Sequence, residues 1–166
     1  MVEKTAYEIL QSREDRAQIQ EELINEYKKS LISFTLNIPG PKKDSPSYRK
    51  IHEIGMEEII SKVEGNIQFI KRNKKKTGPE GFIVVNMDPR KLKKLTIDIE
   101  ENHSLGRIFD MDVFDSNHNQ VSRSDLGEEG RKCLICNKNA KICSREASHW
   151  IEELLERIDK LYREYR

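Results

Sequence analysis

The spacing of apolar residues switches between two periods in the middle of the chain, and this alternation restricts the fold more than any other feature. Over residues 31–38 apolar side chains occupy alternate positions, which is the period of a strand. Further strand signals cover 66–70, 82–85 and 108–114, and a short partner strand opens at Val121. One helical stripe lies between the strands at 31–38 and 66–70, and a second lies between those at 82–85 and 108–114. Their apolar residues are Ile51, Ile54, Ile59 and Val63 in the first, and Leu92, Leu95 and Ile99 in the second.

The resulting order, strand–helix–strand–strand–helix–strand, predicts an α+β fold. Ser45-Pro46 and Asp88-Pro89 each place a capping side chain before a proline at the first helical position, so both helices have clear start signals. A ferredoxin-like sheet with both helices on one face suits this order. A nucleotidyltransferase-like mixed sheet fits it too, and the sequence does not separate the two.

Helices are also expected at both ends of the chain. Residues 5–30 carry apolar side chains at loose helical spacing, and residues 147–165 carry a regular apolar stripe. The length of 166 residues suits one domain. We therefore expect a single domain, 1–166, with an N-terminal helix at 1–30, an α/β core at 31–125, and a Cys/His knuckle with the C-terminal helix at 131–166.

The charge is nearly balanced, with 30 Lys and Arg against 29 Asp and Glu. No overall field favours nucleic acid or a membrane, so a local cluster has to hold any anionic substrate. The N-terminus lacks the apolar core of a signal peptide, and nowhere do about 18 apolar residues run together. These features predict a cytoplasmic protein. The basic run at 71–76 is either a solvated hairpin tip or a docking site for an acidic carrier protein.

Asp110 and Asp112 stand two positions apart in the strand predicted at 108–114. Because strand side chains alternate, both carboxylates should lie on one face while their apolar neighbours pack the other. Adjacent carboxylates repel unless a cation lies between them, and Mg²⁺ binds such oxygens together with a substrate phosphate. The pair predicts a magnesium site for nucleotidyl or phosphoryl transfer. Two surface aspartates at a strand end are the alternative interpretation.

Several basic residues are candidates for holding a phosphate near this pair. Arg107 follows Gly106 in the turn before the strand, where glycine allows close approach of a ligand and arginine can bind phosphate through two nitrogens. An ordinary glycine cap, with Arg107 paired to Asp110, is the alternative. Lys42 lies in a stiff loop at a strand end, a common location for ligand sites. Further anion-binding candidates are Arg123, Arg131 and Arg145, and a third metal ligand is left open among Asp98, Asp115 and Asp125.

All three cysteines fall within a short segment together with a histidine, at Cys133, Cys136, Cys143 and His149. An odd, clustered set does not resemble a disulfide framework. Three thiolates and one imidazole are an accepted ligand set for tetrahedral zinc, and the first pair has the spacing of a zinc knuckle. The segment predicts a structural Zn²⁺ site that tethers the last helix to the sheet. Three reduced cysteines in a turn are the alternative.

Three motifs, taken together, resemble one known family. They are LISFTLNIPGPK (31–42), HSLGRIFDMDV (103–113), and RKCLIC (131–136) followed by AKICSR (140–145) and His149. The early SREDR (12–16) also fits. In this order, and over nearly the whole chain, they resemble the holo-citrate lyase synthase family, also called apo-citrate lyase phosphoribosyl-dephospho-CoA transferase. The basic run at 71–76 is not part of that pattern.

The resemblance implies a nucleotidyltransferase. Its donor would be 2'-(5-triphosphoribosyl)-3'-dephospho-CoA, and its acceptor a serine hydroxyl on the acyl carrier (gamma) subunit of citrate lyase, with pyrophosphate released. In that reaction Asp110 and Asp112 are expected to hold Mg²⁺ against the triphosphate, while Arg107 and Lys42 neutralise charge on pyrophosphate. Gly106, Arg123 and Arg131 are expected in the donor site.

Two functions of other classes are also compatible with these residues. One is a non-catalytic, zinc-stabilised adaptor that binds a carrier protein. The other is a zinc-knuckle module for nucleic acid, which the balanced charge and the lack of an aromatic-basic face disfavour.

Overall fold

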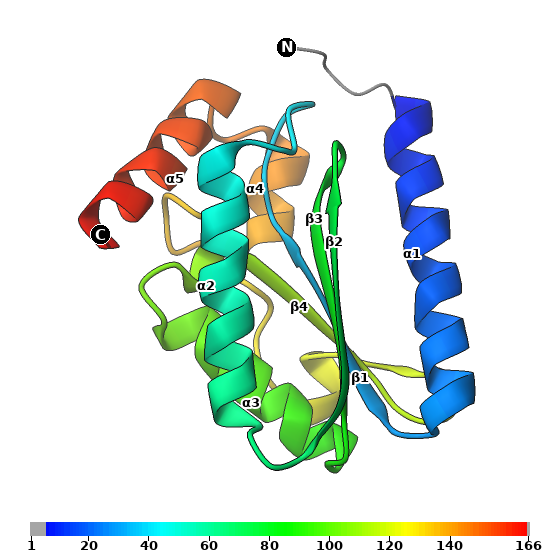
Figure 1. Cartoon of the computed structure of the whole chain (residues 1–166). Coiled ribbons are helices and arrows are strands. Elements are labelled where there is room, and N and C mark those ends of the chain that lie inside the picture. Colours follow the sequence, from blue (N-terminus) through cyan, green and yellow to red (C-terminus); the bar gives the residue numbers. More distant parts are fainter. Residues whose placement is uncertain (1–5, 166) are drawn as a thin grey trace.

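A five-stranded sheet forms the centre of the protein in the computed structural model, which describes residues 6–165 (Figure 1). Its strands are β1 (Ser30–Leu36), β2 (Ile67–Lys75), β3 (Gly78–Val85), β4 (Phe109–Phe114) and β5 (Gln120–Val121), in the order β2-β3-β1-β4-β5. The predicted α+β class is confirmed, but every neighbouring pair is antiparallel, so the sheet is not the mixed sheet that was also predicted. Helix α2 connects β1 to β2, but β3 lies between these two strands in the sheet. Strands β1 and β2 therefore never form a parallel pair.

Helices cover both faces of the sheet (Figure 1). Helices α2 (Pro46–Lys62) and α3 (Pro89–Asn102) lie on one face, as predicted, and α5 (Ile151–Tyr165) lies beside α2. Helix α1 (Ala6–Tyr27) lies on the opposite face. The remaining elements are the short helix α4 (Ala140–Glu146) and the 3-10 turns η1 (Gly106–Ile108) and η2 (Ser124–Leu126).

The predicted start signals of α2 and α3 are confirmed. The Ser45 hydroxyl accepts a hydrogen bond from the Tyr48 amide at 3.1 Å, and the Asp88 carboxylate accepts one from the Lys91 amide at 3.1 Å. In each helix a proline follows the cap, where no amide hydrogen is needed. Local sequence chemistry therefore fixes where both helices begin.

Two predicted segments differ from the structure. The residues between the strands predicted at 66–70 and 82–85 are mostly strand themselves, because β2 and β3 continue as a hairpin through the basic run to a turn at Lys76 and Thr77. Backbone pairing extends the strands beyond their apolar residues, and Arg72 forms a two-nitrogen ion pair with Glu53 of α2. The helix expected at 147–165 begins later, at Ile151, and the short helix α4 precedes it; α4 ends because Ala147 takes a left-handed conformation with φ of 50°.

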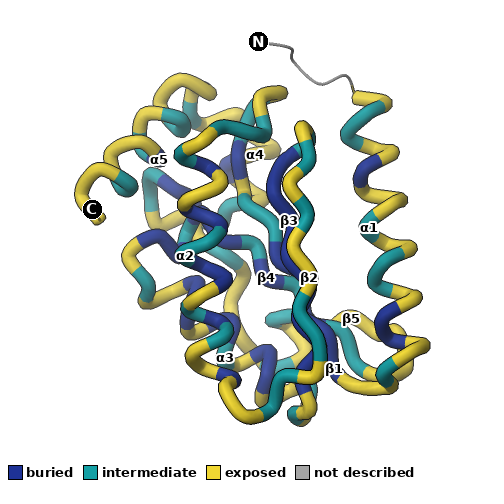
Figure 2. The backbone as a smooth tube through the Cα atoms, viewed as in Figure 1, coloured by how far each residue is buried: buried dark blue, intermediate teal, exposed yellow. Residues whose placement is uncertain are grey.

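The sheet face beneath α2 and α3 carries the larger apolar core (Figure 2). Helix α2 approaches the sheet closely at Gly55, where a Cβ atom would lie 2.4 Å from the Phe34 ring. His52 is buried on the same face, stacks on Phe34 at 4.3 Å between ring centroids, and donates to the Phe34 carbonyl at 3.0 Å. Burial lowers the pKa of His52 below its ordinary value of 6.5. This face is built for close packing.

The face beneath α1 is apolar only along part of its length. A second, smaller core joins Leu23 and Ile24 of α1 to Leu31, Phe82 and Val84 of the sheet. Towards the start of α1 the contacts become polar, as described below. Within residues 6–165, none of the helices has the length and apolar character needed to cross a membrane.

Candidate active site

The two aspartates of β4 point to the α1 face of the sheet. Burial alternates along the strand: Phe109, Met111 and Val113 enter the larger core, whereas Asp110 and Asp112 are half-buried on the other side. In the register with β1, Asp110 lies opposite Thr35 and Asp112 opposite Ser33. The two carboxylates therefore share one face, as the strand period predicts.

Side chains of α3 hold the backbone between these aspartates. Strand β5 pairs only with Val113 and Phe114 of β4, so the edge of the strand at Met111 is left for other partners. Buried Lys93 donates to the Met111 carbonyl at 3.1 Å, and the Met111 amide donates to buried Glu100 at 2.8 Å. These two charged groups take the place of a neighbouring strand and fix the position of both carboxylates.

The electrostatics of the pair are unfavourable without a cation. Burial, and then the neighbouring Asp110 carboxylate, raise the pKa of Asp112 from 3.8 to about 6. The charge of Lys93 acts in the opposite direction but does not cancel these effects. Gln120 donates to Asp112 at 3.2 Å. A divalent cation between the two groups would relieve this repulsion, so the residues fit the Mg²⁺ that the sequence analysis predicts.

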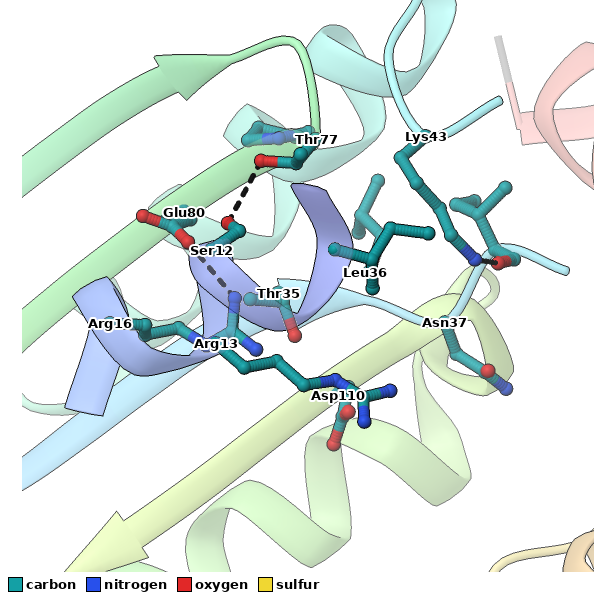
Figure 3. A pocket seen from close by; sticks show the side chains of 14 residues that line it. Ser12, Arg13, Arg16, Thr35, Leu36, Asn37, Lys43, Thr77, Glu80 and Asp110 are labelled. Carbon is teal, nitrogen blue, oxygen red and sulfur yellow. Dashed lines mark hydrogen bonds and ion pairs between the residues drawn. The ribbon is translucent and has the colours of Figure 1, made fainter. Parts of the chain in front are cut away.

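A polar cavity of about 190 Å³ lies between α1 and the sheet, beside Asp110 (Figure 3). We call it the polar cavity; its charged lining residues are Arg13, Arg16, Lys43, Glu80 and Asp110. It holds three cations and two carboxylates. A metal ion at the carboxylates would leave the cavity strongly positive, which suits a polyanion such as a phosphate chain.

Polar contacts to the β2–β3 hairpin fix α1 over this cavity (Figure 3). The hydroxyls of Ser12 and Thr77 are hydrogen bonded at 2.8 Å, and Arg16 donates to Glu80 at 2.9 Å. The Glu80 side chain is only 2% exposed. Because a buried carboxylate is costly without a partner, this ion pair ties the helix to one place on the sheet.

Arg13 and Lys43 supply the other positive charges. Arg13 extends across the cavity towards Asp110 (Figure 3). The Lys43 ammonium donates to the Ile38 carbonyl, and partial burial, followed by the charge of Arg13, lowers the pKa of Lys43. An ammonium has three donors and a guanidinium five. The cavity therefore offers donors for a phosphate next to the carboxylate pair.

A second cavity, of about 930 Å³, borders the first. We call it the large cavity; its lining includes apolar Pro39, Leu134, Ile151 and Leu154 and basic Arg131, Lys141 and Arg145. Asn37 and Asp110 line both cavities. The described residues that line these two cavities do not include Asp112. Asp110 therefore lies at the boundary between a small polar space and a larger, more apolar one.

Two predicted site residues are directed elsewhere. Arg107 was expected beside the carboxylates, but it donates to the Cys133 carbonyl at 3.0 Å and to Asn137 at 3.4 Å. Gly106 is buried against the end of α3, where a Cβ atom would lie 2.2 Å from the Glu100 carbonyl oxygen. The close approach that requires glycine is thus to the chain's own backbone. The η1 turn aims Arg107 at the cysteine-rich segment.

The arginine that forms an ion pair with Asp110 is Arg131. Its guanidinium lies 3.5 Å from Asp110 and also donates to the Arg107 carbonyl at 3.0 Å. Arg123 forms a part-buried ion pair with Glu100 at 2.6 Å. Lys42 is exposed, and its neighbour in the chain, Lys43, lines the polar cavity instead. The acidic candidates for a third ligand each accept a local hydrogen bond, Asp98 from Asn102, Asp115 from Asn117 and Asn119, and Asp125 from Ser122.

The cysteine-rich segment brings its four candidate ligands together. The ligand atoms of Cys133, Cys136, Cys143 and His149 all lie within 4.8 Å of one another, so this cluster could hold a metal ion. The sulfurs of Cys136 and Cys143 are 3.5 Å apart. The His149 imidazole lowers the pKa of the Cys136 thiol, whereas burial raises that of Cys143. Within the described chain, His149 Nε2 is buried without a hydrogen-bond partner.

Comparison with known proteins agrees with the motifs. The model of the CitX family, described as apo-citrate lyase phosphoribosyl-dephospho-CoA transferase, matches residues 4–165. The chain belongs to this family. A transferase of that name from Escherichia coli O7:K1 is 35% identical over 157 residues, which is 93% of this chain and 86% of the relative. Protein CitXG of Haemophilus influenzae is 35% identical over 156 residues, which is 92% of this chain but 34% of that longer protein.

In this member of the CitX family, the structure adds site residues that the sequence analysis did not single out. Arg13 belongs to the SREDR run, which indicates the family but no site, and the lysine that the sequence favours is Lys42, not Lys43. A signal did exist for Arg13: it lies three positions before Arg16, a spacing that makes two side chains neighbours on a helix surface. Nothing in the sequence indicated which surface of the sheet that helix would cover.

Proposed function

We propose that this chain transfers the prosthetic group of 2'-(5-triphosphoribosyl)-3'-dephospho-CoA to a serine of the acyl carrier (gamma) subunit of citrate lyase. The serine oxygen forms a bond to the first phosphorus of the triphosphate, and the bond from that phosphorus to pyrophosphate breaks. Pyrophosphate leaves with the electron pair, and the serine proton passes to a base. We treat residues 1–166 as one transferase domain.

One observation carries this proposal. Asp110 lies at the boundary of two cavities, next to a second carboxylate on the same strand face. Family membership supports the same chemistry, because the relatives are named for this transfer. A non-catalytic adaptor would need neither the carboxylate pair nor the cationic cavity beside it, so these features favour the enzyme.

Asp110 and Asp112 are the residues that would hold Mg²⁺, which supplies charge neutralisation at the phosphates when bound. The half-exposed Asp110 carboxylate is also placed to accept the serine proton, because its side chain is 42% exposed and faces both cavities. Arg131, at 3.5 Å, orients that carboxylate. Lys93 and Glu100 hold the strand, so that both groups keep their positions as charge builds up on the departing pyrophosphate.

The test of this function is direct. Mixing the chain with apo acyl carrier protein, the donor and Mg²⁺ should increase the mass of the carrier by that of the donor minus pyrophosphate, and release one pyrophosphate. The Asp110→Asn variant should transfer about 10²–10³-fold more slowly with an unchanged Tm, because a charge at the reacting centre is lost without loss of volume.

The matched control is Glu57→Gln, which removes an exposed carboxylate from α2 on the opposite side of the sheet. It should transfer at the rate of the unaltered chain. Full activity in Asp110→Asn would remove Asp110 from the mechanism. A carrier whose mass never changes would end the proposed function.

We also propose that the cysteine and histidine cluster holds a structural Zn²⁺. In a tetrahedron with zinc–sulfur bonds of about 2.3 Å, sulfurs lie about 3.8 Å apart, and Cys136 and Cys143 are 3.5 Å apart without a metal. Metal analysis of the purified protein should find one zinc per chain. Finding no zinc together with three titratable thiols would contradict this site. Reduced, metal-binding cysteines and the proposed substrates agree with a cytoplasmic location.

A further inference from the structure

We infer that the two cavities divide the donor between them: the polar cavity takes the pyrophosphate leaving group, and the large cavity takes the dephospho-CoA body. This inference rests on the proposed function and adds to it the orientation of the donor. Neither the family description nor the carboxylate pair indicates on which side of Asp110 each half of the donor lies. The lining of the two cavities does.

The shared boundary is the first step of the argument. Asn37 and Asp110 are the residues that line both cavities, so a ligand that crosses from one to the other passes directly over the Asp110 carboxylate. In the proposed reaction the bond that breaks joins the small leaving group to the large remainder of the donor. Placing that bond at Asp110 puts one part of the donor into each cavity.

Size then decides which part goes where. The polar cavity has a volume of about 190 Å³ and the large cavity about 930 Å³. Only the second falls in the range of typical pockets for drug-sized ligands, about 300–1,000 Å³. A nucleotide with a pantetheine arm therefore fits the large cavity, whereas two linked phosphates are small enough for the polar one.

The chemistry of the walls agrees with this assignment. Arg13 and Lys43 present charged donors in the polar cavity, where a phosphate chain can accept several hydrogen bonds. The large cavity has apolar side chains from the first turn of α5, Ile151 and Leu154, against which an adenine or pantetheine group can pack. Exposed Arg145 at its rim is available for the internal diphosphate of dephospho-CoA.

The orientation also constrains the acceptor. Phosphoryl transfer places the attacking and leaving oxygens roughly in line. With pyrophosphate beneath α1, the serine of the carrier protein has to approach from the side of Asp110 that faces away from the polar cavity. Arg13 and Lys43 then act on the leaving group and do not contact the carrier.

Two fragments of the donor test the division separately by calorimetry: inorganic pyrophosphate with Mg²⁺, and dephospho-CoA, which lacks the triphosphoribosyl arm. Arg13→Gln should weaken pyrophosphate binding about tenfold or more, because a charged hydrogen bond is lost. Its affinity for dephospho-CoA should change less than twofold. Ile151→Asn, or Arg145→Gln if the first variant misfolds, should show the reverse pattern.

Lys94→Gln is the control, since this exposed lysine lies on α3 and lines neither cavity; both affinities should be unchanged. The proposed division of the donor is overturned if both variants weaken the binding of both fragments equally, or if each variant weakens the binding of the other fragment. Transfer to the carrier protein would stand in either case. Failure of the unaltered chain to bind either fragment also overturns it. Loss of the proposed function itself would be recognised separately, by a carrier protein whose mass does not change.

Discussion

The two faces of the sheet use alternate residues of the same strands for different purposes. Under α2 and α3 the side chains are apolar and tightly packed, with Gly55 and Phe34 in direct contact. Under α1 the strands place Glu80 and Asp110 beside cations and Asp112 next to Asp110, and a cavity remains between helix and sheet. The first face stabilises the fold by packing, whereas on the second the repulsion between Asp110 and Asp112 costs stability. A strand with period 2 can therefore carry a core and a reactive site at once.

This comparison predicts that substitutions on the packed face destabilise the protein. In Gly55→Ala the new methyl group would overlap the Phe34 ring at 2.4 Å, so α2 has to move away from the sheet. We expect a loss of about 3 kcal/mol in the free energy of unfolding, near the upper end for overpacking. Urea denaturation measures it. Ser61→Ala, at an exposed position of the same helix, should change stability by less than about 0.5 kcal/mol. An unchanged midpoint in Gly55→Ala would show that α2 is not tightly packed.

On the face beneath α1, a substitution at Asp112 is expected to stabilise the protein instead. The pKa of Asp112 is raised from 3.8 to about 6, so the folded state prefers the protonated form and stability falls as pH rises through this interval. Asp112→Asn should therefore stabilise the metal-free protein at pH 7.5 by about 1–2 kcal/mol. The gain should vanish near pH 3. Transfer activity should fall in the same variant. A variant less stable than the unaltered chain at pH 7.5 would contradict the repulsion.

Two adjacent lysines distinguish the phosphate site predicted from the sequence from the one that the structure indicates. Lys43 lines the polar cavity and Lys42 is exposed. Lys43→Gln should lower kcat/KM for transfer about tenfold, because a charged donor to phosphate is removed. Lys42→Gln should have the smaller effect. A larger loss in Lys42→Gln would favour the sequence prediction and place the phosphates outside the polar cavity.

The smallest expected effect is a pH dependence from the packed face. His52 is buried, and its pKa is lowered, so the neutral form is favoured in the folded state. Its contribution to stability is full above its ordinary pKa of 6.5 and is lost as pH falls from there. The stability difference between the unaltered chain and His52→Gln should therefore be constant above pH 6.5 and shrink below it. A difference that is independent of pH from 8 to 5 would mean that His52 does not titrate in this range.

Much of the local structure was predictable from the sequence. The caps at Ser45 and Asp88 fix where α2 and α3 begin, because a side chain meets an amide three residues later. The shared face of Asp110 and Asp112 follows from the strand period alone. The gathering of Cys133, Cys136, Cys143 and His149 was likewise predicted from their short spacing along the chain.

Contacts between remote segments were decided only by tertiary structure. The sequence placed Arg107 beside Asp110 because the two are neighbours in the chain, but the η1 turn directs Arg107 away and Arg131 takes its place. It also could not place Arg13 over the sheet. Periodicity and capping act within a few residues, whereas the strand order and the face that α1 covers depend on which apolar surfaces are buried together. The sequence itself therefore determined that the two carboxylates share one strand face. Which cations lie around them was decided by the packing of the folded chain.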